Sequence, residues 1–532
     1  MNAAAMHDGR RRRLLVCCII FAIAAALRLA IIDHQGLWAD EVFSLAMATG
    51  HSLEHPASQA QPERGDYVEA PHALPATEYR RYLEHQDPPV GPAQVLRAVR
   101  LSDTSPPLYY LLLWAWTRVG GTSDASLRSF SVCWALACFP FLWSLAKKIG
   151  GRQATWPMLI LFTVSPLSIY YSTEGRMYSL LWFLAASLAW LTFKLNQRGS
   201  RPVLLVLWIV VSAAGLLTHY FYVFIVLACG IWLLLYPGRL NRALILAAGA
   251  GIGILISPWY LHVADSLALW RVTKDWLLIP SVPSRAIAAL NLPWTLISPN
   301  SQWWSSDPPL TYLAMVVFVL LLFFAIATLK WRLLSKRRQL IWIWLIAACA
   351  GPFVFDRIMG TYTTGVPRYA IAGMPAALLL MSLALGRVRP TPRALWLLLI
   401  VMVWLPSVWT VETNPVRGWQ PYRQLASILD QQATDSDVVI VHSIPSGVLG
   451  MARYLEKPVP IFSWVGQLKQ RHVPDDLESL PARGRIILIK IHTVGEPAPE
   501  EAWLQTHASL ASDVKMAAAE VLFFVRQPIP LP

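Results

Sequence analysis

The sequence is short of charge. Only 14% of its residues are Asp, Glu, Lys or Arg, while 55% are hydrophobic and 25 are tryptophan. An average soluble domain is roughly 45–50% apolar and about 25% charged, so this composition excludes an ordinary soluble protein and predicts a polytopic membrane protein. The net charge of +14 comes from short basic clusters between apolar runs. We therefore expect membrane lipids as partners and no nucleic acid.

The positions of the cysteine and histidine residues predict neither a disulfide framework nor a metal site. All six cysteines lie inside apolar stretches and none lies in the long polar segments. A disulfide or zinc framework is therefore not predicted. Four histidines of the first polar segment have no metal-ligand spacing, and we expect them to be solvated. They are His51, His55, His72 and His85.

Apolar runs long enough to span a bilayer, about 20 residues each, are abundant. Eleven candidate spans lie at 14–32, 127–146, 154–171, 177–195, 202–219, 221–236, 243–261, 311–329, 340–356, 369–386 and 394–410. Residues Arg10–Arg13 are basic and an apolar run follows them, which resembles a signal peptide. No small-x-small cleavage motif follows in 28–40, so we expect an uncleaved first span.

A twelfth apolar stretch, "PPLYYLLLWAWTRVGG" from Pro106, is shorter and aromatic, as is typical of interfacial segments. Counting it as a span would invert every later loop. With the stretch lying flat and a cytoplasmic N-terminus, the cytoplasmic segments hold 20 Lys and Arg against one acidic residue, Asp8. The positive-inside rule favours this arrangement. It makes residues 33–126, 262–310 and everything after about 411 external.

We therefore predict an all-α polytopic membrane domain over residues 1–410 and a small extracytoplasmic α/β domain over 411–532. The tail alternates helical patterns, such as "YRQLASILDQQ", with apolar strand-like runs: "DVVIVHS", "RIILIKIH" and "AEVLFFVRQ". That alternation is typical of an α/β unit. The tryptophans of the 262–310 loop either stack on a sugar or mark the membrane interface, and we favour the interface.

Polar residues from distant parts of the chain fall on this one external face. They are Asp40 and Glu41 after the first span, Glu174, Arg176 and Tyr178 in one turn, His219, and Arg368. Each has a simpler explanation. Asp40 and Glu41 could mark a solvated helix end, Glu174 could pair with Arg176, His219 could be an ordinary turn residue, and Arg368 could be an interfacial anchor.

One reaction uses a carboxylate beside an arginine at a membrane surface: transfer of a sugar from a lipid phosphate carrier. A carboxylate can act as the general base for the acceptor hydroxyl. The leaving group is already a phosphate, so it needs positive charge, which arginine supplies through paired hydrogen bonds. A glycosidase would need a second carboxyl group as an acid.

Several motifs resemble membrane glycosyltransferases of the C-type fold, the group of the protein O-mannosyltransferases and the aminoarabinose transferases of lipid A. They are "LWADE", "SPPLYYLLLW", "SIYYSTEGRMYSLL", "THYF" and "VPRYAIAGMPAALLL". The resemblance covers about residues 14–386. It implies juxtamembrane helices in the first external loop, which agrees with the flat stretch after Pro106 and hence with eleven spans. It also implies a polyprenyl-phosphate sugar as donor.

The resemblance also implies roles for single residues. Asp40 is the expected catalytic base with Glu41 as its companion, and Arg368 is expected to meet the carrier phosphate. Glu174 is expected to hold the acceptor or the site, although many relatives carry Asp at that position. Arg176, Tyr178 and His219 are assigned to substrate binding from their chemistry alone.

Two other functions stay open at this point. A transporter or flippase for lipid-linked sugars usually has ionisable residues or broken helices near the bilayer midplane, whereas the polar groups here gather at one face. A lipid-linked glycan ligase or polymerase would share most of the chemistry. The expected location is the inner (plasma) membrane with an external active site. The acceptor is a lipid, glycan or protein hydroxyl, no cofactor is certain, and two carboxylates do not specify a metal.

Overall fold

The computed structural model describes residues 3–54, 60–102, 105–199, 201–262, 277–282, 284–298, 335–416, 418, 420–468, 470–480, 484–492, 498–516 and 518–526. It divides into two compact units. We name the first the helical unit; it contains the described residues of Met1–Ile32, Arg128–His262 and Asp275–Thr413. We name the second the mixed unit; it contains those of Asp33–Leu127 and Asn414–Pro532.

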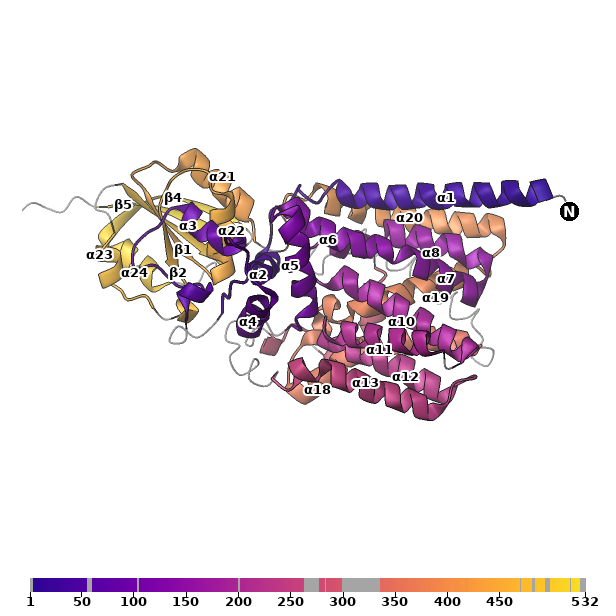
Figure 1. Cartoon of the computed structure of the whole chain (residues 1–532). Helices are drawn as coiled ribbons and strands as arrows, with labels where there is room; N and C mark the ends of the chain where they lie inside the picture. Colours follow the sequence, from indigo (N-terminus) through magenta and orange to yellow (C-terminus); the bar gives the residue numbers. More distant parts are fainter. Residues whose placement is uncertain are drawn as a thin grey trace, which may run out of the picture. The chain divides into compact units, whose positions relative to one another are not determined.

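The helical unit consists of long apolar helices that run beside one another (Figure 1). Its main helices are α1 (Ala3–Leu29), α6 (Asp124–Ala137), α7 (Phe139–Gly150), α8 (Arg152–Val164), α9 (Pro166–Ser172), α10 (Tyr178–Arg198), α11 (Pro202–Leu216), α12 (Val223–Leu235), α13 (Arg242–Tyr260), α16 (Arg285–Thr295), α18 (Lys336–Met359), α19 (Met374–Leu385) and α20 (Pro390–Thr413). Short 3-10 turns η4 (Tyr220–Tyr222), η6 (Thr363–Gly365) and η7 (Pro367–Gly373) join some of them.

Among the described residues, six helical segments are long and apolar enough to cross a membrane: Asp124–Gly150, Tyr178–Arg198, Arg242–Tyr260, Lys336–Met359, Pro367–Leu385 and Pro390–Thr413. Three shorter apolar helices accompany them. Ten of the eleven predicted spans coincide with helices, and the span at 311–329 lies outside the described residues. The predicted span 154–171 is broken at Ser165, where Pro166 removes a backbone donor and starts α9 with Ser165 as its N-cap.

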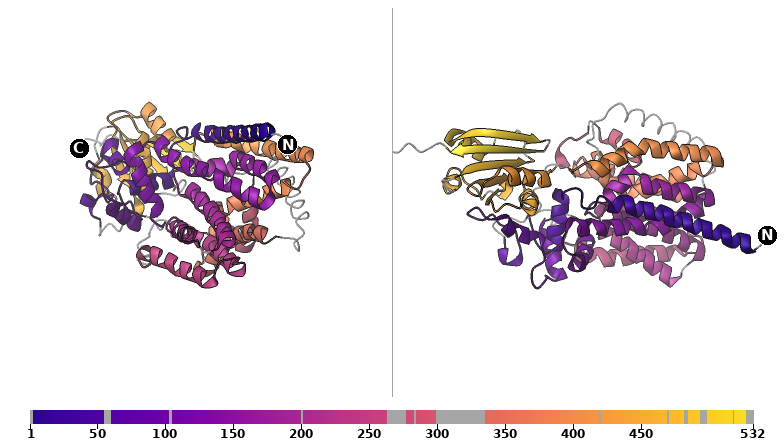
Figure 2. Two further views of the ribbon diagram at one scale, coloured as in Figure 1. Left: turned by 45° about the vertical axis from the view of Figure 1, so that its right-hand side comes forward. Right: turned by 90° about the horizontal axis from the view of Figure 1, so that it is seen from above.

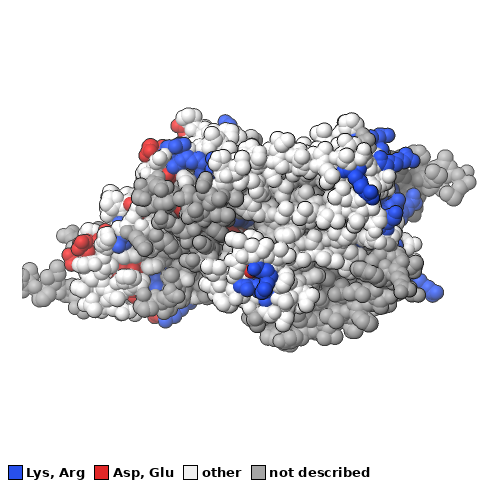
Figure 3. Space-filling view, turned by 90° about the horizontal axis from the view of Figure 1, so that it is seen from below, with Lys and Arg blue, Asp and Glu red and all other residues white. Residues whose placement is uncertain are grey.

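Basic side chains gather at one end of the helical unit, while its middle shows almost no charge (Figure 3). Lys148 at the end of α7 lies within electrostatic range of Lys194, Arg198 and Arg337. Three of the basic loops predicted to be cytoplasmic therefore meet at this end.

The mixed unit combines the first polar segment of the chain with a small sheet. The first polar segment forms α2 (Ala39–Ala48), η2 (Pro62–Arg64), α3 (Ala76–Arg80), η3 (Arg81–Leu83), α4 (Pro92–Ser102) and α5 (Leu108–Gly120). Helix α5 is the stretch after Pro106, and it packs against α2 and α4 of its own segment. Its buried side carries Tyr109, Tyr110 and Leu113.

The C-terminal sheet domain has five strands in the order β2-β1-β3-β5-β4 (Figure 2). The strands are β1 (Val438–His442), β2 (Ile461–Trp464), β3 (Arg485–Ile491), β4 (Ala508–Met516) and β5 (Ala519–Arg526). The helical elements are α21 (Tyr422–Gln432), α22 (Pro445–Tyr454), η8 (Gly466–Leu468), α23 (Asp475–Glu478) and α24 (Pro499–His507). Strand β1 runs parallel to β2 and β3, whereas β5 is antiparallel to β3 and β4.

The first polar segment covers the free edge of strand β2. Leu74 exchanges backbone hydrogen bonds of 2.9 and 2.7 Å with Ile461, and the Tyr67 hydroxyl donates to Ser463 Oγ at 2.8 Å. Uncovered edge strands invite pairing with other chains. Covering this edge ties the first polar segment to the sheet domain within one unit.

Candidate functional site

The two adjacent carboxylates open helix α2 and have different surroundings. Glu41 is fully buried, and its Oε2 accepts the backbone N–H of Trp38, the residue before the helix, at 3.3 Å. This is the reciprocal half of a capping box, which satisfies a backbone donor at the helix start. Asp40 points from the same turn but is half-buried. Glu41 therefore acts on its own helix, while Asp40 is more accessible.

Asp40 lies close to Tyr422 at the start of α21. Burial raises the pKa of the Tyr422 phenol, and the negative charge of Asp40 raises it further. A carboxylate at the first turn of a helix is also favoured by the helix dipole. Asp40 is therefore half-buried at the start of α2, within electrostatic range of the Tyr422 phenol.

In the helical unit, Tyr171 at the end of α9 marks a second polar cluster. The charges of Glu174 and Arg368 and the phenol of Tyr178 all act on Tyr171, and the rings of Tyr171 and Tyr178 lie 4.9 Å apart in an edge-to-face arrangement. Glu174 and Tyr178 are buried. Two motifs separated by nearly 200 residues of sequence thus meet here.

His219 joins this cluster through Tyr369. The ring of His219 lies 6.3 Å from that of Tyr369, and the guanidinium of the neighbouring Arg368 lies 5.7 Å from the Tyr369 ring centre, within cation–π range. His219 Nδ1 also accepts the backbone N–H of Phe221 at 3.2 Å, so the other ring nitrogen carries the proton in the neutral form.

Arg176 is largely buried in the turn that carries Glu174. Its backbone carbonyl accepts a hydrogen bond from Ser131 Oγ of α6 at 3.3 Å. The structure therefore brings together Glu174, Arg176 and Tyr178 with Arg368 and, through Tyr369, His219. Asp40 and Glu41 belong to the mixed unit.

A buried carboxylate that the sequence analysis missed organises the approach to Arg368. Asp356, at the end of α18, is fully buried and accepts five hydrogen bonds from a threonine-rich turn. The donors are Thr361 Oγ1, both the backbone N–H and Oγ1 of Thr363, and both the backbone N–H and Oγ1 of Thr364, at 2.6–2.9 Å. The sequence feature that could have identified this residue is an acidic side chain shortly before the threonine-rich "TYTTG".

A second missed residue is Arg28, fully buried near the end of α1. Its guanidinium donates to the carbonyls of Phe162 and Thr163 at the end of α8, and to Ser168 Oγ of α9. These acceptors lie where Ser165 and Pro166 break the span. Arg28 thus replaces helical hydrogen bonds at a break, as polar groups must when backbone is irregular at membrane depth.

The expectation that the first-segment histidines are solvated is wrong for His51. It is buried, with Nδ1 bonded to Thr49 Oγ1 at 3.0 Å, and burial together with nearby Arg81 lowers its pKa to about 4. His85 is half-buried and bonds Thr117, His72 is exposed, and His55 lies outside the described residues. In the described part of the chain, no group of three His, Cys, Asp or Glu could hold a metal ion.

The chain matches known proteins in sequence and in fold. Residues 104–262 match the family model "Dolichyl-phosphate-mannose-protein mannosyltransferase". The crystal structure of ArnT from Cupriavidus metallidurans bound to undecaprenyl phosphate superposes with a TM-score of 0.54 at 12% identity, over 95% of this chain and 97% of that one. The chain therefore has the C-type fold of membrane glycosyltransferases, and residues 104–262 carry the sequence pattern of the mannosyltransferase family. This confirms the resemblance seen in the motifs.

Two further solved structures resemble this chain at lower TM-scores. The apo form of the Cupriavidus metallidurans ArnT gives a TM-score of 0.51 at 12% identity, over 98% of each chain. AglB, the oligosaccharyltransferase of Archaeoglobus fulgidus in complex with an inhibitory peptide and a dolichol-phosphate, gives 0.49 at 11% identity, over 98% of this chain and 75% of that one. A search of curated protein sequences finds no match.

Proposed function

We propose that this glycosyltransferase moves a sugar from a polyprenyl-phosphate carrier to an acceptor hydroxyl at the external face of the inner membrane. The observation that carries the proposal is the gathering of Glu174, Tyr178 and Arg368 around Tyr171, in a fold whose Cupriavidus metallidurans representative was crystallised with undecaprenyl phosphate. A cation is what a phosphate leaving group needs.

The reaction requires one base and one phosphate site. The acceptor oxygen forms a bond to the anomeric carbon while its proton passes to the Asp40 carboxylate. The bond between that carbon and the phosphate oxygen breaks, and its electron pair leaves with polyprenyl phosphate, whose charge is balanced by Arg368. A base contributes about 10²–10⁴-fold to such a step.

The remaining residues have supporting roles in this proposal. Glu41 caps the helix that presents Asp40, and Glu174 holds the acceptor or the site. Arg176, Tyr178 and His219 line the substrate site beside Arg368. Most polar groups of the cluster are buried, so the local dielectric is low. Each electrostatic contact with the substrate is therefore stronger than it would be in water.

The membrane orientation is part of the same proposal. The N-terminus is cytoplasmic, and the basic end that contains Lys148 faces the cytoplasm. Reporter fusions test this: a fusion after Lys148 is expected to report cytoplasm, and one within the C-terminal sheet domain is expected to report the external side. An external signal after Lys148 would reverse the orientation.

The experiment that tests the function is the glycan profile of the envelope with and without the gene, read by mass difference. Loss of one sugar residue from a lipid, glycan or protein is the expected result, and it names the sugar and the acceptor class together. Loss of a whole glycan would instead identify a lipid-linked glycan ligase or polymerase. Loss of the sugar together with accumulation of the lipid-linked sugar on the cytoplasmic side, where it cannot reach the external acceptor, would support a flippase.

A further inference from the structure

Backbone N–H groups at the start of α2 donate hydrogen bonds to two side chains of the C-terminal segment. The N–H of Leu37 donates to the hydroxyl of Tyr454, the last residue of α22, at 2.7 Å. The N–H of Ala39 donates to Gln420 Oε1 at 3.4 Å. Ala39 is the first residue of α2, so its N–H has no partner within the helix, and Leu37 lies just before the N-cap residue Trp38. Asp40 follows Ala39 directly.

Tyr454 is held in place by a buried group of charges. Its hydroxyl donates to Asp124 at 2.5 Å, and Asp124 also accepts from Arg453 at 2.8 Å and from Arg423 at 3.2 Å. Burial raises the pKa of the Tyr454 phenol, and the charge of Asp124 raises it further. The hydroxyl therefore keeps its proton for Asp124 and offers its lone pair to Leu37.

Gln420 is fixed from the other side by the ends of two strands. Its Oε1 accepts from Ala39, so its Nε2 is the donor to His492 Nε2 at 2.8 Å. His492 Nδ1 then donates to Ser443 Oγ at 3.3 Å. Ser443 follows β1 and His492 follows β3, and the carboxyl ends of parallel strands are where α/β sheets usually bind ligands.

Two glycines allow close packing at this junction. A Cβ at Gly36 would lie 3.2 Å from Arg423 Cβ. Gly418 has a φ of +61°, and a Cβ there would lie 2.9 Å from the ring of Trp38. The segment before α2 thus lies directly against the sheet domain.

We propose that the C-terminal sheet domain is a clamp for the first turn of α2, with Tyr454 and Gln420 as positioning residues for Asp40. The inference rests on the proposed function, because it assigns the clamp the task of aiming the catalytic base. A base displaced by about 1 Å loses much of its effect.

The test uses the full chain reconstituted in lipid, with hydrogen exchange and turnover measured on the same samples. Tyr454→Phe removes only the hydroxyl. It is expected to speed exchange of the Leu37 to Glu41 amides by about 5- to 10-fold, the worth of one hydrogen bond. Turnover is expected to fall while the donor KM stays unchanged. Tyr79→Phe, which removes a hydroxyl bonded to the Ile461 carbonyl, is the matched control and leaves α2 exchange unchanged.

Each outcome separates the clamp from the proposed function. Unchanged α2 exchange in Tyr454→Phe would show that the hydroxyl does not hold the helix and would overturn the clamp. Faster exchange with unchanged turnover would overturn the positioning role. Normal turnover in Asp40→Asn would refute the base assignment, while the exchange result would still decide whether the sheet domain holds α2. Gln420→Met, which removes the acceptor of the Ala39 N–H, is a second variant with the same expected direction.

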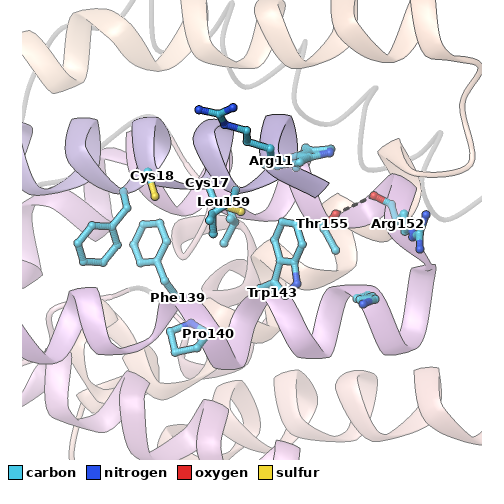
Figure 4. Close-up of a pocket in the computed structure, with 13 residues that line it drawn as sticks. Arg11, Cys17, Cys18, Phe139, Pro140, Trp143, Arg152, Thr155 and Leu159 are labelled. Atoms are coloured by element: carbon cyan, nitrogen blue, oxygen red, sulfur yellow. Dashed lines mark hydrogen bonds between the residues drawn. The ribbon is translucent and has the colours of Figure 1, made fainter. Parts of the chain in front are cut away.

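A second, independent observation concerns a groove of about 1370 Å³ in the helical unit between α1, α7 and α8 (Figure 4). Its lining is apolar and aromatic along most of its length and cationic through three side chains. The apolar and aromatic members include Leu14, Phe21, Phe139, Trp143, Trp156 and Leu159, and the cationic members are Arg11, Lys147 and Arg152. None of the lining residues is acidic.

We infer that this groove binds an anionic phospholipid, with the headgroup phosphate at the cations and the acyl chains along the aromatic wall. Arginine and lysine at membrane depth suited to headgroups attract anionic lipids by about 1 kcal/mol per charge. Phe21 and Leu14 are exposed, which gives acyl chains a surface to cover. The groove uses none of the residues assigned to sugar transfer.

The test is native mass spectrometry of the protein released from vesicles of phosphatidylglycerol or phosphatidylcholine. Retained phosphatidylglycerol is expected to exceed phosphatidylcholine, and to fall about 30-fold in Lys147→Ala/Arg152→Ala, which removes two charges. Lys194→Ala/Arg198→Ala removes the same charge from the same end without touching the groove and is expected to keep the lipid. Equal retention of the two lipids, or an equal loss in both double variants, would show only unspecific attraction and overturn the site.

Discussion

The cluster around Tyr171 and the first turn of α2 hold polar side chains by different means. The cluster is built from the ends of buried helices, and its turn before Arg368 is fixed by the carboxylate of Asp356 within the same unit. The turn of α2 depends on hydrogen bonds from residues several hundred positions away in sequence, such as Tyr454. Changes in the cluster should therefore act locally, whereas changes in the sheet domain should reach Asp40.

The largest effect is expected at Asp40. Asp40→Asn keeps the shape of the side chain but removes the base, so turnover should fall about 10²–10⁴-fold with little change in the donor KM. Glu41→Gln removes charge from a buried cap and should mainly lower the thermal unfolding midpoint. The measurement is turnover of the purified protein with the polyprenyl-phosphate form of the sugar that the glycan profile identifies. If Glu41→Gln were the inactive variant and Asp40→Asn the active one, the assignment would be reversed.

Arg368 should show the next largest effect, and on a different parameter. Loss of a charge-assisted hydrogen bond of about 1.5–3 kcal/mol predicts about 10- to 100-fold weaker binding of polyprenyl phosphate by Arg368→Ala. Arg368→Lys keeps the charge without the planar fork and should recover part of the affinity. Titration with polyprenyl phosphate in nanodiscs measures both. Equal loss for donor and acceptor would indicate a structural role.

Substitution of Asp356 tests whether phosphate binding by the cluster depends on the threonine-rich turn that this carboxylate holds. Asp356→Asn puts an amide NH₂ where the carboxylate accepts from the backbone and the hydroxyl of Thr364. Leaving buried donors unpaired costs about 3 kcal/mol in total, so the midpoint of thermal unfolding should fall and polyprenyl phosphate should bind more weakly. Thr361→Val, which removes a single donor, should have a smaller effect. Unchanged phosphate binding in Asp356→Asn would separate this turn from Arg368.

The sequence predicted most of the fold because apolar pattern and charge are local signals. Strands β1, β3 and β5 are apolar runs and were expected, whereas β4 (Ala508–Met516) was missed. Most of β4 is exposed at the edge of the sheet, so no burial constrains its sequence to an apolar pattern. Strand β2 was missed for its length of four residues.

The candidate residues were found through motifs, but their partners were not. Nothing local in "LWADE" distinguishes the cap from the accessible carboxylate, because that depends on which side chain folds back on Trp38. The five bonds of Asp356 depend on a turn whose path the sequence pattern does not reveal. His51 looked solvated since the loop around it is polar, yet Tyr82 and Thr49 enclose it. Such contacts arise from tertiary packing alone.

The smallest predicted effect concerns His51, whose lowered pKa makes the stability of the mixed unit depend on pH. Its folded pKa of about 4 lies below the unfolded value of about 6.5, so the folded state keeps the ring neutral. The stabilisation is complete above pH 6.5 and is lost as the pH falls towards 4. Between pH 7 and 5 the linkage is worth about 2 kcal/mol.

Thermal unfolding of the full chain at pH 7 and pH 5 measures this contribution. The midpoint should fall on acidification, and the fall should shrink in His51→Gln, which cannot take up the proton. His72→Gln is the matched control, because His72 is an exposed histidine of the same segment and its replacement should leave the pH dependence as it was. Burial also lowers the pKa of His492 to about 4, so part of the pH dependence remains in His51→Gln. A fall of the midpoint that is as large in His51→Gln as in the unchanged chain would exclude His51 as an acid-sensitive group.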